Sequence, residues 1–452
     1  MSPLNESSLS RREHQLPPGP RMPSPIQAMG WALRPLSFMD RCHQSYGETF
    51  TLRVRRGRPW VFLTNPEHVK QVFTTDSALM GAGAGEANPL LEPLLGPRSV
   101  MLLDEPQHMR DRKNLLPSFH GRRMQDYGEM MSEVARRETR KWPIGEPFEL
   151  WPRMQAISLE VVMRAVFGTT AGERLELLRE RLVEMTNWIN TPHRLTLLAA
   201  VGARSMTANS EFRAVVHPVE ALVLDEVRQR RAAGEVDERE DILTMLDRAY
   251  NGTETQMDDE KMRDELVTML SDGPTATSLA WVFERLLRHP EKLARLREEV
   301  LAGESEEYVE AVVKETLRLC PAVPVVMRRL VEQTRLGGYT LPPETIVAPC
   351  VYLMHRRADV YPQPRSFRPE RFLEGSAGTY TWIPFGGGPR RCVAASFAQL
   401  EMKRVIQTVL REVELRPAES RSESAARSSV SFVPDGGARV VATRRRHVAM
   451  TT

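Results

Sequence analysis

Hydrophobic positions along this chain follow the helical period over most of its length. Between Met124 and Leu246, apolar residues recur every three or four positions, which places them on one face of an α-helix. An interruption at residues 190–208 divides this region into two helical parts. The same period predicts helices over residues 26–46, 257–289 and 308–319 and directly after residue 392.

Strand-like runs are short and lie toward the two ends of the chain. Residues 49–54 and 60–63 are rich in β-branched and aromatic side chains, and Arg56-Gly57 between them predicts the turn of a β-hairpin. Further strands are predicted at residues 334–339, 346–353, 430–433 and 439–442, the last two as a terminal hairpin. The whole pattern indicates a mainly α-helical protein with small β-sheets, an α+β fold.

Composition narrows the class of protein. Of the 452 residues, 41% are apolar and 27% are charged, which is typical of a globular chain. The 62 basic and 59 acidic residues leave a net charge of +3, too small to favour nucleic acid binding. The four cysteines form no CxxC pair, which argues against a zinc site or a disulfide framework and fits the reducing cytoplasm. No segment reaches the ~18 uninterrupted apolar residues of a transmembrane helix, so we expect a cytoplasmic protein without a membrane anchor.

The two ends of the chain differ from its body. Residues 1–15 are polar and predict a disordered N-terminus, and residues 446–452 predict a frayed tail. Leu16-Pro17-Pro18-Gly19-Pro20 predicts a stiff, extended lead-in. Between these ends, residues 16–445 are predicted to form a single catalytic domain.

The stretch Phe385-Gly386-Gly387-Gly388-Pro389-Arg390-Arg391-Cys392 has the composition of a loop that holds one cysteine in place. Its three glycines allow positive φ and a close approach to a flat ligand, and Pro389 stiffens the turn. Arg390, Arg391 and the dipole of the following helix favour a thiolate at Cys392. A thiolate held in this way is a good axial ligand for haem iron. The alternative is a glycine turn before a structural cysteine.

Four residues of this loop, Phe385, Gly388, Arg390 and Cys392, resemble the haem-binding signature of the cytochrome P450 family, the haem-thiolate monooxygenases. The last position of that signature is usually glycine and is Ala394 here, a small departure. The resemblance implies a soluble, bacterial-type member with the cytochrome P450 fold, in which haem b lies between the long central helix and the helix after the cysteine loop. It also implies Cys392 as the iron ligand and Phe385 and Gly386 as haem contacts.

A second motif lies upstream of the cysteine. Glu315 and Arg318 form an ExxR pattern, which carries little information alone because exposed ion pairs are common. Between it and the cysteine stands Phe367-Arg368-Pro369-Glu370-Arg371-Phe372. In the family, the Glu and Arg of ExxR pair with the arginine of this later motif. The resemblance therefore implies a buried structural triad of Glu315, Arg318 and Arg371.

The haem propionates need cationic or hydrogen-bonding partners. His108 and Arg112 are four residues apart, so they share one helix face and could bind an anion, although such spacing alone more often marks a solvated face. The family carries a propionate-binding pair on the matching helix. The resemblance implies His108, Arg112, Arg328 and Arg390 as propionate ligands.

The helix predicted over residues 257–289 departs from the family in its middle. Family members carry an acid–alcohol pair there that helps to deliver protons, whereas this chain has Gly273 and Pro274. We expect Pro274 to bend the helix because it removes a backbone hydrogen bond. Ser271 and Ser278 share a face with residue 274 and could hold a water, while Thr275 is turned away by about 100°. The candidate catalytic positions are Ser271, Asp272, Pro274 and Thr275.

An apolar substrate is expected from the aliphatic and aromatic residues of several segments. The glycine- and proline-rich segment 78–97 predicts either a lid over an apolar site or a surface connection. Residues 190–208 match the place of the family's access loop or form a plain helix connection. The resemblance implies insertion of one oxygen atom from O2 into a C–H bond. Terpenoid, fatty acid and polyketide-like molecules all fit an apolar site, and the sequence does not choose among them. The candidate pocket residues are Leu90, Leu94, Trp188, Leu270, Val323, Val325 and Phe432.

Electrons are expected from a separate ferredoxin or flavodoxin with an NAD(P)H-dependent reductase, because the chain has no flavin or ferredoxin module. The residues that could form a docking patch for such an acidic partner, or an ordinary solvated surface, are Arg110, Lys113, Arg122, Arg123, Arg391, Lys403 and Arg404. Two other functions stay open. Gly273-Pro274 favours a peroxygenase or a haem-thiolate rearrangement or dehydration enzyme, and the third possibility is a haem-binding sensor without turnover.

Overall fold

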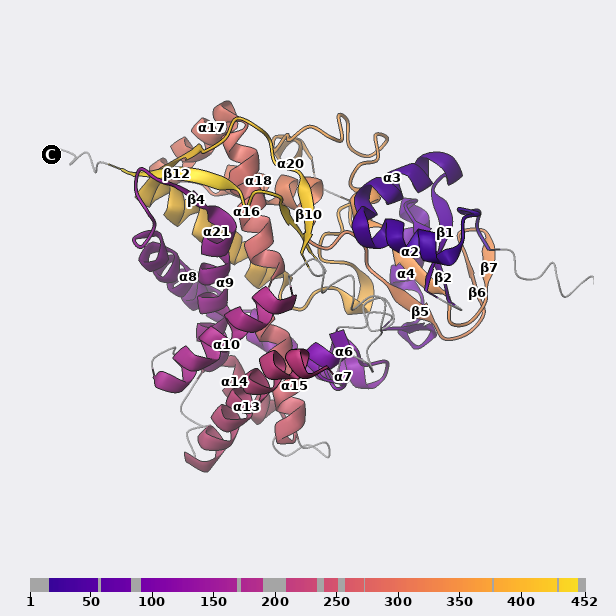
Figure 1. The fold of residues 1–452 in the computed structure, drawn as a ribbon, viewed down its shortest axis with the longest axis horizontal. Helices are drawn as coiled ribbons and strands as arrows, with labels where there is room; N and C mark the ends of the chain where they lie inside the picture. The colour runs from indigo at the N-terminus through magenta and orange to yellow at the C-terminus, as the bar shows by residue number, and fades with distance from the viewer. Residues whose placement is uncertain are drawn as a thin grey trace, which may run out of the picture.

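The computed structural model describes residues 16–55, 58–82, 91–168, 172–189, 209–233, 240–250, 257–271, 273–375, 378–428 and 431–445. Figure 1 shows a large helix-rich part beside a smaller part that contains β1, β2 and the N-terminal helices. The fold is mainly α-helical with small sheets, as the hydrophobic pattern predicts.

The helix-rich part contains most of the described helices. They are α6 (Leu91–Leu95), α7 (Gln107–Leu115), α8 (Arg123–Thr139), α9 (Leu150–Phe167), α10 (Glu173–Ile189), α13 (Ser210–Ala233), α14 (Ile242–Tyr250), α15 (Asp259–Leu270), α16 (Pro274–Leu287), α17 (Pro290–Ala302), α18 (Glu307–Leu319), α20 (Arg371–Glu374) and α21 (Ala395–Glu412). Their apolar faces form one continuous core. No helix among the described residues is long and apolar enough to cross a bilayer.

Helix α16 lies in the middle of this core, packed against α9, α18 and α21. Every residue from Thr275 to Leu287 except Arg285 is buried. A helix buried on all sides must be apolar or internally paired, and the buried carboxylate of Glu284 contacts both Arg285 and Arg288. The single helix predicted over residues 257–289 is instead two helices: α15 ends at Leu270, and α16 begins at Pro274 because proline suits the first turn of a helix.

Two small sheets complete the helix-rich part. Strands β4 (Pro147–Glu149), β12 (Arg439–Arg444) and β9 (Val413–Pro417) form one, and β10 (Ala425–Ser428) and β11 (Ser431–Pro434) form the other. The predicted terminal hairpin was wrong, because its two strands, β11 and β12, belong to different sheets. β11 pairs with the preceding strand β10, whereas β12 pairs with β4 and β9.

The smaller part is built on a five-stranded sheet in the order β1-β2-β8-β5-β3. Its strands are β1 (Thr49–Arg55), β2 (Arg58–Leu63), β8 (Ile346–Pro349), β5 (Arg328–Leu330) and β3 (Met80–Gly81), and a separate hairpin joins β6 (Thr334–Leu336) and β7 (Tyr339–Leu341). Helices α2 (Ser24–Leu33), α3 (Pro35–Tyr46), α4 (Pro66–Thr74) and α19 (Val351–Met354) belong to this part. The β1–β2 hairpin confirms the prediction, with Phe50 opposite Phe62.

Two predicted boundaries in this part were wrong for local reasons. The helix predicted over residues 26–46 is divided into α2 and α3 at Arg34, because the residue before a proline is biased away from the α conformation and Pro35 follows. The strand predicted over residues 346–353 ends at Pro349, and residues 351–354 form the helical turn α19. Proline cannot donate to a β-ladder, which is why the strand ends there.

Candidate active site

The cysteine loop is held by its own backbone and by helix α4. The N–H of Cys392 donates to the carbonyl of Phe385 at 2.9 Å, which closes the loop. Gly386 and Gly388 have φ of +68° and +66°, in the left-handed region that favours glycine. A Cβ on Gly388 would lie 2.3 Å from the carbonyl oxygen of Phe73 in α4. The loop therefore requires glycine for two reasons: the backbone has positive φ at these positions, and a side chain at residue 388 would clash with the backbone of Phe73.

The cysteine lies just before α21 and not within its first turn. A short 3-10 turn occupies Gly388–Arg390, and α21 begins at Ala395, three residues after Cys392. Cys392 is exposed, whereas Cys42 and Cys350 are buried. Cys392 is thus accessible to a ligand that lies against the loop.

Four cationic or donor residues gather near this loop, and we call His108, Arg112, Arg328 and Arg390 the cation cluster. Arg112 donates to the carbonyl of Arg391 at 2.5 Å, one residue before the cysteine. Arg390 donates to the carbonyl of Leu103 at 2.6 Å. Nearby charges act on one another within the cluster, since Arg390 lowers the pKa of both His108 and Arg328 after the larger effect of burial.

The cation cluster carries more positive charge than its described surroundings balance. Arg328 is only 8% exposed, its Nη1 donates to the carbonyl of Met327, and no described carboxylate lies within ion-pair distance of it. Burial and then Arg390 lower the pKa of Arg328 to about 9. Arg390 lies 3.8 Å from Asp104 through Nη2, but its Nε atom is buried without a hydrogen-bond partner among the described residues. Buried cations without acids are costly, so the cluster fits an anionic ligand such as the two propionates of haem.

Glu315, Arg318 and Arg371 do meet, and we call them the triad. Arg318 donates from Nε and Nη2 to the two carboxylate oxygens of Glu315 at 2.7 and 2.8 Å. Arg371 lies 3.1 Å from the same carboxylate, and Glu315 and Arg318 are both fully buried. The remaining donors of Arg318 are taken by the carbonyls of His355, Pro364 and Ser366. Every charge and donor of Arg318 is therefore satisfied by the protein.

The break between α15 and α16 changes the expected geometry of the catalytic positions. Ser271 donates to the carbonyl of Val267 at 2.8 Å, and Ser278 donates to the carbonyl of Pro274 at 2.9 Å. Ser271 directly follows α15, whereas Ser278 lies within α16, so the two serines do not share one face of a continuous helix with residue 274 as predicted. Thr275 is buried in the first turn of α16, and Asp272 lies outside the described residues.

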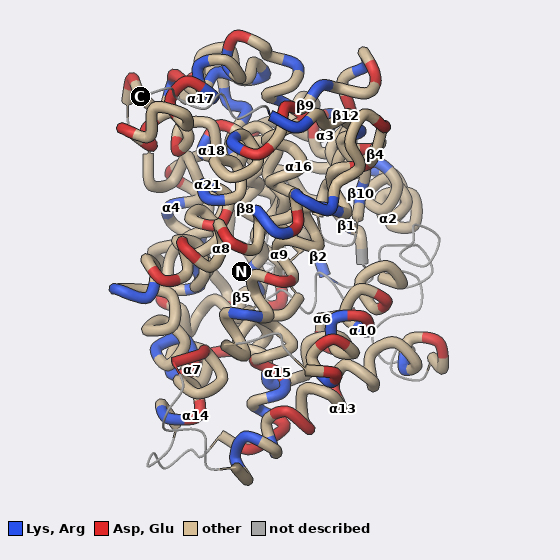
Figure 2. Tube along the Cα trace, turned by 90° about the vertical axis from the view of Figure 1, so that its left-hand side faces the viewer, with Lys and Arg blue, Asp and Glu red and all other residues tan. Residues whose placement is uncertain are grey.

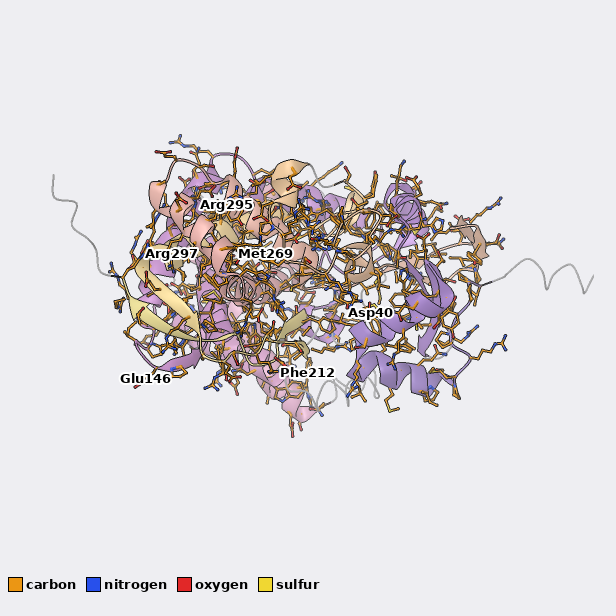
Figure 3. The ribbon with its side chains drawn as sticks, turned by 90° about the horizontal axis from the view of Figure 1, so that it is seen from above. Asp40, Glu146, Phe212, Met269, Arg295 and Arg297 are labelled. Carbon is orange, nitrogen blue, oxygen red and sulfur yellow. The ribbon has the colours of Figure 1, made fainter. Side chains whose placement is uncertain are left out.

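The predicted pocket residues fall in several places. The rings of Trp188 in α10 and Phe212 in α13 pack edge-to-face, with 5.6 Å between their centroids. Phe212 is labelled in Figure 3. Leu94 and Leu270 pack into the main helical core. Phe432 is buried in β11, where its carbonyl accepts a hydrogen bond from Trp281 at 2.7 Å. Leu90 and residues 190–208 lie outside the described residues.

The segment after α18 places a different valine at the cysteine loop. Val323 is half-buried, and Val325 is buried in the core of the smaller part. Val326 is the residue that approaches the loop, since a Cβ on Gly386 would lie 3.6 Å from its side chain. Neighbouring residues of an extended chain point to opposite sides, so a shift of one position separates a core residue from one that faces the loop.

The charged surface is mixed, and Figure 2 shows basic and acidic residues interspersed along the chain. Lys403 and Arg404 both pair with Glu306, and Arg123 lies 3.9 Å from Glu240. The predicted docking residues that remain exposed and form no ion pair among the described residues are Arg110, Lys113, Arg122 and Arg391. The predicted patch is therefore smaller than the sequence indicates.

Sequence reasoning missed three residues that shape this site. Glu105 accepts a hydrogen bond from Nδ1 of His108 at 2.8 Å, and its i,i+3 spacing could have indicated it. Phe73 supports Gly387 and Gly388, but no local pattern points from α4 to the cysteine loop. His355 binds the backbone of both Arg318 and Ile383, which ties the triad to the approach of the cysteine loop.

Comparison with known proteins agrees with this geometry. The family model described as "Cytochrome P450" matches residues 17–437. The curated "Putative cytochrome P450 135B1" of Mycobacterium tuberculosis is 36% identical over 97% of this chain and 93% of its own length. "Putative cytochrome P450 137" of the same organism is 32% identical over 95% of this chain and 93% of its own length.

Two solved structures show the same fold at low sequence identity. The "Retinoic acid bound cyanobacterial CYP120A1" superposes with a TM-score of 0.79 at 20% identity, covering 96% of this chain and all of that one. The "cytochrome P450DA heme domain" gives a TM-score of 0.80 at 20% identity over 96% of this chain and 99% of that one. This chain belongs to the cytochrome P450 family, and it is therefore a haem-binding monooxygenase, an oxidoreductase whose iron is held by a cysteine thiolate.

Proposed function

We propose that this protein oxidises an apolar small molecule of terpenoid, fatty acid or polyketide-like character, using O2 and electrons from a ferredoxin or flavodoxin with an NAD(P)H-dependent reductase, in the cytoplasm. The observation that carries the proposal is the glycine loop of Cys392 beside the cation cluster, in which Arg328 is buried without a described carboxylate. The four exposed cations Arg110, Lys113, Arg122 and Arg391 support an acidic electron donor.

In this proposal, Cys392 ligates the iron, and the cation cluster binds the propionates. Bound haem with a thiolate ligand supplies the power to cleave the O–O bond. The glycine loop fixes the sulfur, because its backbone hydrogen bonds and the contact with Phe73 leave little freedom. Glu105 orients the imidazole of His108 by accepting from Nδ1. The triad keeps a structural role, since Arg318 has no donor left for a ligand.

Proton delivery must use groups other than an acid–alcohol pair. Pro274 has neither a side-chain donor nor a backbone N–H. Helix ends leave backbone groups without partners inside the helix, and the break between α15 and α16 places two such ends together. We propose that water held at this break, or a hydroxyl of the substrate, delivers protons, with slower or less coupled turnover than a family member that has the pair.

A second candidate function is peroxygenase or rearrangement and dehydration chemistry. The same observation, Gly273 and Pro274 in place of the acid and the alcohol, favours it, because such reactions do not need protons for O2 activation. A non-catalytic haem sensor is the third and weakest candidate. Turnover separates them: product from O2 with NADPH supports the monooxygenase, product from peroxide or without oxidant supports the second, and no product supports the sensor.

The iron ligand is tested with Cys392→Ser. We expect the variant to lose the red-shifted band of the reduced carbon monoxide complex together with all oxygenase activity, because a serine hydroxyl cannot replace the thiolate. Cys320→Ser is the matched control and should keep both. A Cys392→Ser protein with the band and the activity of the native protein would contradict the assignment.

The proton route is tested by restoring the missing pair with Gly273→Asp/Pro274→Thr. Gly273 has a φ of −85° and no described atom within 4 Å of a Cβ, so the aspartate has room. We expect more product per NADPH consumed than in the native protein, by about threefold or more, since one positioned general acid typically contributes far larger factors. Thr275→Val is the control for the neighbouring hydroxyl. Unchanged coupling in the restored variant would show that this position does not limit proton delivery.

A further inference from the structure

Helix α2 presents an apolar face to the outside of the smaller part. Met22, just before the helix, and Ile26, Met29 and Leu33 within it are 42%, 48%, 55% and 63% exposed. The three helical positions lie within about 60° of arc at 100° per residue. The other exposed large apolar residues of the described chain are scattered, so this face is the one place where they follow a helix.

The helix is reversed relative to an ordinary surface helix, which buries its apolar side. The buried residue of α2 is Gln27, whose amide nitrogen donates to the carbonyls of Pro20 and Met22 and whose oxygen accepts from the N–H of Arg53. One turn later Trp31 packs edge-to-face against Trp60 and Phe62 at 5.5 and 5.7 Å. These inner contacts set the orientation of α2, with its apolar face turned outward.

The segment of chain that carries this face is basic. From Leu16 to Met39 the chain has no acidic residue, while Arg21 and Arg34 flank the helix and are both exposed. Arg41 in α3 and Arg53 in β1 are exposed as well. The first acid after Leu16 is Asp40, labelled in Figure 3, which accepts from the hydroxyl of Tyr352 at 3.0 Å. An apolar face bordered by arginines is complementary to an anionic lipid surface.

We propose that the outer face of α2 lies in the plane of an anionic membrane surface, with Ile26, Met29 and Leu33 among the acyl chains and Arg21 and Arg34 at the phosphate groups. No membrane-spanning helix is involved. Binding is reversible and sensitive to salt, because one short helix buries little apolar area and charges at the surface are screened. The inference rests on α2 alone and does not depend on the substrate or the redox partner.

The test is co-sedimentation of the full-length, haem-loaded protein with vesicles. Phosphatidylcholine vesicles with an equal share of phosphatidylglycerol are compared with pure phosphatidylcholine vesicles. We expect binding to the anionic vesicles that falls about tenfold or more in Ile26→Asp/Leu33→Asp. We expect a fall of about fivefold per residue in Arg21→Gln and Arg34→Gln. The matched control is Leu177→Asp/Val183→Asp on α10, where both side chains are exposed away from α2 and the added charge is the same.

Each outcome decides the proposal. Loss of binding in the α2 variants, with the control and the carbon monoxide band unchanged, supports it. Three results overturn it: no binding of the native protein to anionic vesicles, equal binding of the α2 variants, or equal binding to both kinds of vesicle. A native dimer in solution that Ile26→Asp/Leu33→Asp converts to a monomer, without vesicle binding by either, would assign the face to a second copy of this chain.

Discussion

The triad and the cation cluster both take arginine side chains out of water, but only the triad pairs each of its arginines closely with a carboxylate. In the cluster, Arg390 lies 3.8 Å from Asp104, whereas no described carboxylate lies within ion-pair distance of Arg328. Arg318 is fully buried, and Glu315 together with three backbone carbonyls accepts all of its hydrogen bonds. Arg328 is almost as deeply buried, yet among the described residues its side chain donates only to the carbonyl of Met327. Arg318 and Arg328 are therefore two buried guanidinium groups in opposite electrostatic conditions.

This difference separates a structural network from a binding site. A buried ion pair that is fully hydrogen-bonded contributes little net stability, but breaking it strands a charge. A buried cation without an acid costs free energy until an anion arrives, and that cost is what makes the site select an anion. We therefore expect changes in the triad to affect folding and changes in the cation cluster to affect haem retention.

The largest expected effect comes from Glu315→Ala. The variant leaves Arg318 buried and without its carboxylate, which should cost roughly 3–5 kcal/mol of folding free energy. Little folded, haem-loaded protein should be recovered, as measured by soluble yield and by denaturant unfolding of what remains. Glu374→Ala is the control, because its pair with Arg368 is exposed and should contribute less than about 1 kcal/mol.

A different outcome for Glu315→Ala would reverse the assignment. A soluble, haem-replete variant with native unfolding behaviour and an altered rate would mean that Glu315 acts in catalysis and not in folding. The triad would then not be a structural network, and it would not differ from the cation cluster in the way described above.

Much of the triad and of the cysteine loop could be predicted from the sequence, because the residues involved are close together in the chain. Glu315 and Arg318 lie one turn apart in a strongly periodic segment, and the glycines of the cysteine loop are adjacent to the residue they serve. Arg371 could be added only through the family resemblance. The helical period also located the main helices, since it follows directly from which residues face the core.

What could not be predicted depends on contacts between distant segments. The pairing of β12 with β4 and β9 joins strands far apart in the chain, and no local pattern specifies it. The support of Gly388 by Phe73 and the placement of Val326 at the loop are of the same kind. The break at Arg34 was different: Pro35 indicated it, but the apolar period on both sides outweighed that indication.

Haem binding by the cation cluster is tested with a variant of Arg328. Arg328→Leu removes a buried cation that no described carboxylate balances, so the variant should fold. It should release haem about 10–100-fold faster, since a hydrogen bond to a charged group contributes about 1.5–3 kcal/mol. Transfer of haem to apomyoglobin measures the rate. Arg329→Leu, which removes an ion pair with Asp104 and Glu344 nearer the surface, is the control and should leave haem release unchanged.

Two results would contradict the binding role of Arg328. If Arg328→Leu fails to fold as Glu315→Ala is expected to fail, Arg328 is a structural cation with a partner in the native protein. If the variant folds and retains haem as well as Arg329→Leu does, the cation cluster does not bind the propionates through this residue.

The smallest effect is a pH dependence of the network around the triad. His355 is fully buried: its Nε2 accepts from the N–H of Ile383 at 2.9 Å, which leaves the proton on Nδ1 to face the carbonyl of Arg318 at 3.1 Å. Burial, followed by the charges of Arg318 and Arg356, lowers the pKa of His355 from 6.5 to about 3. Between these pH values the unfolded chain binds a proton that the folded protein does not. The stabilisation is therefore complete above about pH 6.5 and is lost as the pH falls through this window.

His355→Gln should remove this part of the pH dependence while keeping an acceptor for the N–H of Ile383. The free energy of unfolding of the native protein should fall more steeply between pH 7 and 5 than that of the variant, by at most about 1.4 kcal/mol per pH unit. His120→Gln, at an exposed histidine, should leave the native slope unchanged. Because carboxylates elsewhere titrate equally in all three proteins, the difference between slopes isolates His355. Parallel slopes for the native protein and His355→Gln would mean that the buried imidazole takes up its proton without unfolding, and that the network around Arg318 tolerates a further positive charge.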